Sequence, residues 1–97
     1  MIVKCKSILF SAHAVRRMFL RGIGKDDIRS VIVSGEIIIE YPSDTPYPSC
    51  LMLGFIRDIP IHVVLGINSD VQECIVITTY IPNDELWTDN FRKRRQI

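Results

Sequence analysis

The hydrophobic pattern changes from helical spacing to strand-like spacing near residue 35. Ser11 precedes residues 12–21, in which apolar side chains recur every three or four residues, and Gly22 follows; this predicts a capped amphipathic helix. On a helical wheel, one arc, which we expect to be buried, holds Ala12, Ala14, Val15, Met18 and Phe19. The other arc, the solvent face, holds Leu20 and otherwise only His13, Arg16, Arg17 and Arg21.

A second helix is predicted over residues 25–34, with an acidic start, a glycine stop and a buried stripe of Ile28, Val31 and Ile32. The intervening loop has only three residues, so we expect the two helices to form a hairpin.

Beyond Gly35 the chain reads as strands. These are predicted over 36–41, 50–56, 59–67 and 73–81, with a shorter edge strand within 2–10. The run 42–49 is a proline-rich loop, and tight turns are expected at 57–58 and 68–70. Residues 84–95 predict a short C-terminal helix with Leu86, Trp87 and Phe91 near one side. The fold class is therefore α+β, a helical hairpin on an antiparallel sheet of about four strands.

Length and composition indicate one ordinary globular domain. The chain has 97 residues, of which 47% are hydrophobic and 24% are charged, which excludes a disordered chain. Its apolar runs are too short for a membrane span, and the N-terminus lacks signal-peptide features, so we expect a cytoplasmic protein. The three cysteines lack metal-ligand spacing and are expected to be reduced and unpaired, with no metal or other cofactor.

Charge is unevenly distributed behind a net charge of +1. Residues 1–25 hold six basic side chains and no acid, residues 26–91 hold all 11 acids against two arginines, and residues 92–95 are all basic. The basic ends suit an anionic partner, and they equally suit two solvated patches.

Two histidines and a tyrosine are the candidates for chemistry. His13 lies one helical turn from Arg17, and Arg21 continues that row. Such a row either transfers a proton beside a bound phosphate or is simply the solvated face of the helix. His62 points away from Ile61 and Val63 on its strand, and it is either a proton-transfer group or a structural histidine. Tyr80 ends a strand, where it either packs as a β-former or stacks a base and donates a proton.

An ordered set of short motifs resembles a family of small bacterial domains of unknown function similar to BrnT-type toxins, in the wider RelE/ParE/MqsR-like superfamily. The motifs are SAHAVRRMFLRGI (11–23), GEII (35–38), YPSD (41–44), PYPS (46–49), LMLG (51–54), IHVV (61–64) and ITTYIP (77–82), with Trp87 beyond. They span roughly residues 8–95. The resemblance implies a single domain over residues 1–97, with helices against a curved, RelE-like sheet and a basic tail at 92–97.

The resemblance also implies a function: a toxin of a type II toxin–antitoxin system that cleaves RNA as a metal-independent endoribonuclease. Its partners would be a cognate antitoxin, of the MqsA-like zinc-ribbon and helix-turn-helix kind, and RNA or the ribosome. By position, the catalytic candidates are His13, Arg17, Arg21, His62 and Tyr80. The RNA-binding candidates are Arg16, Arg17, Arg21, Arg57, Arg92, Lys93, Arg94 and Arg95.

Three functions stay open. The chain is that ribonuclease, a catalytically inactive toxin-fold module that docks on a protein partner, or, as a third hypothesis, a small-molecule-binding regulatory domain. The run Arg57-Asp58-Ile59-Pro60 replaces the glycine-containing turn expected before the His62 strand, which leaves the direction of Arg57 open.

Overall fold

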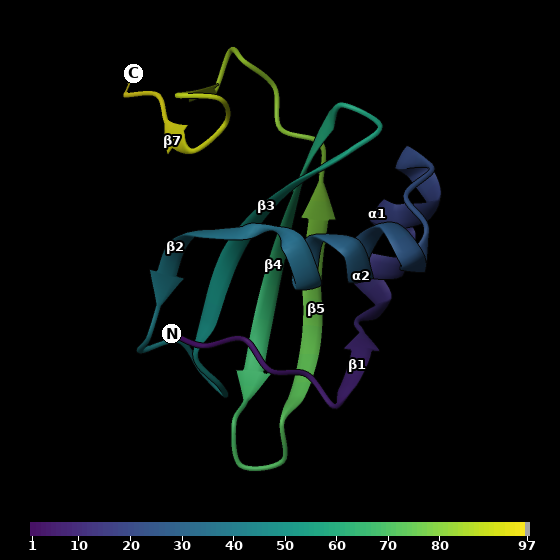
Figure 1. Ribbon diagram of the computed structural model, residues 1–97, viewed down its shortest axis with the longest axis vertical. Coiled ribbons are helices and arrows are strands. Elements are labelled where there is room, and N and C mark those ends of the chain that lie inside the picture. The colour runs from purple at the N-terminus through teal and green to yellow at the C-terminus, as the bar shows by residue number, and fades with distance from the viewer. Residues whose placement is uncertain (97) are drawn as a thin grey trace.

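The computed structural model describes residues 1–96, which form two helices, a five-stranded mixed sheet and a small two-stranded sheet (Figure 1). The elements are β1 (Ser7–Phe10), α1 (Ala12–Arg21), α2 (Lys25–Ser34), β2 (Glu36–Tyr41), β3 (Ser49–Ile56), β4 (Ile59–Asn68), β5 (Glu73–Tyr80), β6 (Trp87–Thr88) and β7 (Lys93–Arg94). The order in the large sheet is β1-β5-β4-β3-β2. The α+β class is confirmed.

The antiparallel strands β2 to β5 form as the sequence pattern predicts, whereas the edge strand β1 differs from the predicted all-antiparallel sheet. β2 to β5 form the predicted meander, and the turn at Arg57 and Asp58 has two positive φ angles, 50° and 66°, as a two-residue hairpin requires. β1 adds a fifth strand that runs parallel to β5. A short segment such as 7–10 carries no signal for its direction, because direction depends on where the chain returns.

The predicted C-terminal helix is wrong. Residues 84–95 form a hairpin in which Trp87 pairs with Arg94 and Thr88 with Lys93. The connecting residues Asp89, Asn90 and Phe91 all have positive φ angles, between 53° and 70°, and a right-handed helix has no place for such residues.

The helices cover one face of the large sheet, where the core lies. α1 packs against β5, and α2 packs mainly against β3, so the two consecutive helices lie on the sheet as expected but have most of their contacts with different strands. The core between helices and sheet contains Ala14, Met18, Ile23, Ile28, Val31, Ile32, Cys50, Met52, Ile61, Val63, Leu65, Ile67, Cys74 and Val76. The predicted buried stripe of α2 is confirmed.

Close approach of α2 to β3 depends on Gly54. A Cβ atom placed there would lie 2.8 Å from Cγ2 and 3.2 Å from Cα of Val31, so only glycine lets the helix backbone come this near the strand.

α1 buries a narrower stripe than the wheel predicts. Only Ala14 and Met18 are buried, whereas Val15 is 48% exposed and Phe19 is 87% exposed. α1 follows directly after β1, the edge strand, and it packs chiefly on β5. A single strand can cover only a narrow row of side chains on α1.

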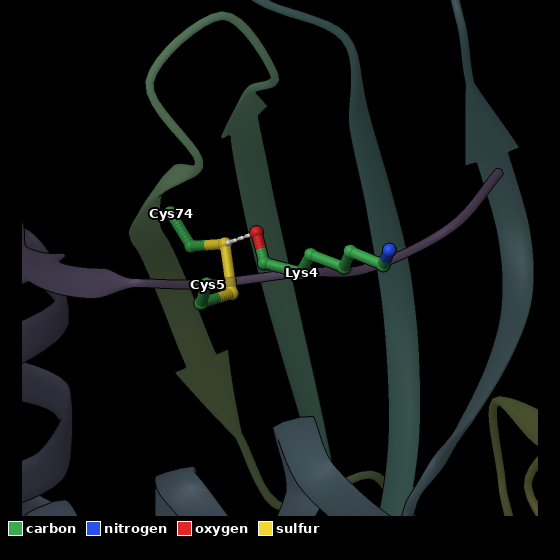
Figure 2. The surroundings of a disulfide bond; sticks show 3 residues. All are labelled: Lys4, Cys5 and Cys74. Carbon is green, nitrogen blue, oxygen red and sulfur yellow. Dashed lines mark hydrogen bonds between the residues drawn. A yellow bond between two sulfur atoms is a disulfide. The ribbon is translucent and has the colours of Figure 1, made fainter.

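The prediction of three unpaired cysteines is wrong for two of them. Cys5 and Cys74 form a disulfide (Figure 2), while Cys50 is a buried free thiol. The parallel β1–β5 ladder places Ser7 opposite Glu73, so Cys5, two residues before β1, comes close to Cys74, the second residue of β5. Cys74 Sγ also lies 3.7 Å from the carbonyl oxygen of Lys4 (Figure 2). A separation of 69 residues hid this contact from spacing arguments.

Within residues 1–96, neither helix has the length and apolar character that a membrane crossing requires.

Candidate functional site

His62 is a fully buried polar side chain on the sheet face opposite the helices, which we call the open face. Its Nε2 lies 2.9 Å from the carbonyl oxygen of Phe91, and its Nδ1 lies 3.2 Å from the hydroxyl of Tyr80. A carbonyl only accepts, so Nε2 carries the proton, and in the neutral ring Nδ1 accepts from the Tyr80 O–H. Burial lowers the pKa of His62, and the hydrogen bond to Phe91 offsets only part of this effect.

The C-terminal hairpin closes over His62. The indole of Trp87 meets the imidazole edge-on, with ring centroids 4.4 Å apart at an interplanar angle of 88°. The Thr79 hydroxyl donates to the backbone carbonyl of His62 at 2.8 Å. His62 therefore links β4, β5 and the hairpin through contacts on every side.

Tyr80 lies between this buried histidine and the surface. It is half-buried, and burial raises its pKa, with a further increase from the nearby Tyr41 and a smaller opposing effect from Arg94. Arg94 itself lies over the Trp87 ring, with its guanidinium carbon 5.8 Å from the centroid. The Tyr80 hydroxyl is therefore a protonated donor near neutral pH, held by His62.

His13 reaches β5 from the edge of the sheet. Its Nε2 lies 2.9 Å from the Thr78 hydroxyl, and the residue is exposed. Ser11 fixes this first turn of α1, because its hydroxyl accepts from the Ala14 N–H at 3.0 Å and donates to the Ile77 carbonyl at 2.8 Å. The N-terminus of α1 is thereby attached to the last residues of β5.

The residues that His13 and His62 contact, Thr78 and Tyr80, both belong to β5. Thr78 and Tyr80 pair with Val64 and His62 and lie on the same face, two residues or roughly 7 Å apart along β5. His13 and Tyr80, two residues predicted from distant motifs, therefore approach the same short stretch of β5.

Arg17 and Arg21 continue the row that begins at His13 along α1. They and Arg16 are exposed, and none of the three forms an ion pair with another residue in 1–96. The row is therefore available to an anion.

Three of the other predicted RNA-binding residues have polar partners within the fold. Arg57 lies 3.7 Å from Asp27 at the start of α2. Arg92 forms an ion pair with Glu36 at 2.6 Å, and Arg95 donates to the Asp84 carbonyl at 2.7 Å. Within the expected basic tail, Lys93 and Arg94 form β7 of the hairpin, and Ile97 lies outside the described residues.

A hollow of about 590 Å³ lies at the far end of β2 and the start of the proline-rich loop. Glu40, Tyr41, Asp44 and Ser49 line it, and Ser49 donates to Asp44 at 2.7 Å. Within residues 1–96, no three His, Cys, Asp or Glu side chains are grouped to hold a metal ion. The carboxylates make this hollow a poor place for a phosphate.

Comparison with known proteins gives one family. No curated protein and no solved structure matches the chain with significance. One family profile matches residues 10–81, about three quarters of the chain, from the end of β1 to just past β5. This range contains His13, Arg17, Arg21, His62 and Tyr80, and it ends before the C-terminal hairpin; the family itself is uncharacterised, and the resemblance to BrnT-type toxins stays a prediction. On this match, the chain belongs to the family described as Domain of unknown function (DUF4258).

Proposed function

We propose that the protein is a metal-independent endoribonuclease and the toxin of a toxin–antitoxin pair. The observation that carries this proposal is the contact of His13 with Thr78, which lies two residues before Tyr80 on β5, beside a row of arginines that form no ion pair within residues 1–96. An imidazole, guanidinium groups and a phenol are the groups that RNA cleavage without a metal requires.

The reaction is a transfer within the RNA. The 2′-oxygen attacks the adjacent phosphorus, the bond from phosphorus to the 5′-oxygen breaks, and the products are a 2′,3′-cyclic phosphate and a 5′-hydroxyl end. His13 takes the 2′ proton, and Arg17 and Arg21 bind the phosphate oxygens on which charge builds up. The Tyr80 hydroxyl turns from Nδ1 of His62 and donates its proton to the leaving 5′-oxygen. His13 is exposed and bound only through Thr78, so a substrate reaches it by displacing one hydrogen bond.

His62 has a different role from the one expected at first. Both of its ring nitrogens are engaged and its side chain is fully buried, so it does not face RNA. It acts as a positioning residue that orients the Tyr80 hydroxyl and keeps the C-terminal hairpin over the sheet.

The proposed cellular partners follow from the toxin resemblance. The protein acts in the cytoplasm, on RNA or on the ribosome, and a cognate antitoxin holds it inactive. Expression without that antitoxin is expected to slow bacterial growth.

The test is cleavage of single-stranded RNA in EDTA by purified protein. His13→Ala is expected to lower the cleavage rate by ~10²–10⁴-fold, and Arg17→Ala to weaken both RNA binding and the rate. Arg29→Ala is the matched control, because Arg29 is also an exposed helical arginine but lies on α2 beside Asp26. Equal losses in the Arg17 and Arg29 variants would contradict the assignment.

The competing function is a docking module without catalysis. The sealed state of His62 favours it, because one of the expected catalytic groups is out of reach of a substrate. Absence of cleavage of any RNA, with and without ribosomes, together with tight binding of a protein partner, would replace the ribonuclease proposal with this one.

A further inference from the structure

The outer surface of α1 carries an apolar patch that no other residue within 1–96 covers. Leu20 is 71% exposed and Phe19 is 87% exposed, with the half-exposed Val15 one turn before Phe19. Val15 and Phe19 form one row, and Arg16 and Leu20 form the adjacent row, since residues four apart are neighbours on a helix. We call these four residues the α1 crest. Adjacent apolar side chains on a surface mark an interaction site more strongly than isolated ones.

The charge around the crest has one sign. Arg16 lies within it, Arg17 and Arg21 flank it, and residues 1–25 contain no aspartate or glutamate. None of these arginines has an ion-pair partner within the described part of the chain. A partner that covers the crest must therefore bring both apolar side chains and negative charge.

We propose that the α1 crest is the docking site for an acidic amphipathic helix of another protein. Such a helix would place its apolar stripe on Val15, Phe19 and Leu20 and its carboxylates beside Arg16 and Arg17. α1 has ten residues and is about 15 Å long, which matches about three turns of a partner helix. Complementary charge at the rim sets the orientation, and the apolar contact supplies most of the affinity.

Other occupants fit the crest less well. Phosphates of RNA would pair with the arginines but would leave Val15 and Leu20 in water. A lipid surface needs a longer apolar face than three side chains on ten residues provide. A second copy of this chain would have to bring its own α2 to the crest. The exposed surface of α2 has one large apolar side chain, Val33, beside the oppositely charged Asp26 and Arg29, so it lacks both the apolar stripe and the negative charge that the crest requires.

The inference is independent of the proposed ribonuclease activity. The crest adjoins the row His13, Arg17 and Arg21 on the same helix, so a docked helix would also hinder access to that row. Docking itself requires no catalysis, and its test uses binding alone.

The experiment measures binding of a synthetic 16-residue peptide, with leucines at i, i+3, i+4 and i+7 spacing and glutamates on both flanks. Fluorescence anisotropy gives the affinity, and amide chemical shifts of the full chain locate the contact. We expect shifts centred on residues 12–21, and at least ~10-fold weaker binding for Phe19→Ser and for Arg16→Glu. Val33→Ser is the matched control, because Val33 is 84% exposed on α2 and should leave the affinity unchanged. Far-UV circular dichroism confirms that each variant is folded.

Four comparison measurements distinguish the proposed partner helix from other occupants of the crest. A scrambled peptide of the same composition should bind at least tenfold more weakly, and equal binding would overturn the proposal. Tighter, Phe19-dependent binding to vesicles of phosphatidylglycerol and phosphatidylcholine, or to single-stranded RNA, would assign the crest to those ligands instead. Self-association in sedimentation that Phe19→Ser abolishes would assign it to a second copy.

Discussion

The burial of His62 predicts that the stability of the protein depends on pH in a defined window. In the unfolded chain this imidazole titrates near its ordinary pKa of 6.5, whereas burial lowers its pKa in the folded protein. Below pH 6.5 the unfolded state therefore binds a proton that the folded state does not, and the free energy of unfolding falls as the pH decreases.

The magnitude follows from one proton. Between pH 7 and pH 5.5 the loss has an upper limit of about 1.3 kcal/mol, reached when the folded imidazole stays neutral throughout. A loss is expected because the protonated ring would remain enclosed by Trp87 and away from water, and the Tyr80 hydroxyl would have to turn round to accept from Nδ1–H. The limit is set by the unfolded chain, so no larger loss can come from this residue.

Urea unfolding followed by the fluorescence of Trp87 measures this directly. Trp87 is the only tryptophan, it is buried, and its ring lies against His62, so its signal reports the hairpin as well as global unfolding. We expect the wild-type unfolding free energy to fall over this range, and the fall to be smaller in His62→Gln, which is less stable at pH 7 by about 1–3 kcal/mol. His13→Gln is the control and should keep the wild-type dependence.

Two results would refute the reasoning. One is a wild-type stability that does not change between pH 7 and pH 5.5, which would mean that the folded protein accepts the proton at no cost. The other is a pH dependence that survives unchanged in His62→Gln, which would assign it to carboxylates or to His13.

Three further predictions concern the scaffold of the site. Gly54→Ala should lower the unfolding free energy by roughly 1–3 kcal/mol in denaturant titrations, because its methyl group overlaps the facing helix, whereas Gly66→Ala, with no protein atom nearer than 3.4 Å, should cost less. Replacing both Cys5 and Cys74 by serine should cost roughly 4 kcal/mol on the chain-entropy account for a bridge spanning 69 residues, and a thermal midpoint unchanged from that of the oxidised protein would contradict it. Ser11→Ala should cost ~1 kcal/mol as a lost helix cap, and broadened amide signals in the first turn of α1 would show the lost attachment to β5.

Local pattern was a reliable guide where a short stretch of chain decides its own structure. The bounds predicted for both helices, 12–21 and 25–34, match α1 and α2, because caps, glycine stops and apolar spacing all lie within those stretches. The meander from β3 to β5 was equally readable, since connections of two residues (57–58) and four residues (69–72) leave consecutive antiparallel strands little choice of neighbour. Alternation also predicted that His62 and Val63 point to opposite faces, and the core contains Val63 and not His62.

The parts that failed depend on distant segments. Nothing near residues 84–95 indicates that Trp87 will pack on His62, and that contact belongs to the hairpin that replaces the expected helix. The outward position of Phe19 follows from the placement of α1 over β5 at the sheet edge, which a helical wheel does not contain.

The sequence by itself determined which side chains are available for chemistry: the row from His13 to Arg21, and His62 and Tyr80 on the later strands. Only the tertiary structure decided how they are used. His13 contacts Thr78, 65 positions away, and His62 lies against the backbone carbonyl of Phe91, 29 positions away. Arg92 pairs with Glu36, 56 positions away. Such contacts depend on how the chain returns to the same place. The free energy that selects the return is the burial of a shared core, to which buried residues from both helices and from β3, β4 and β5 contribute.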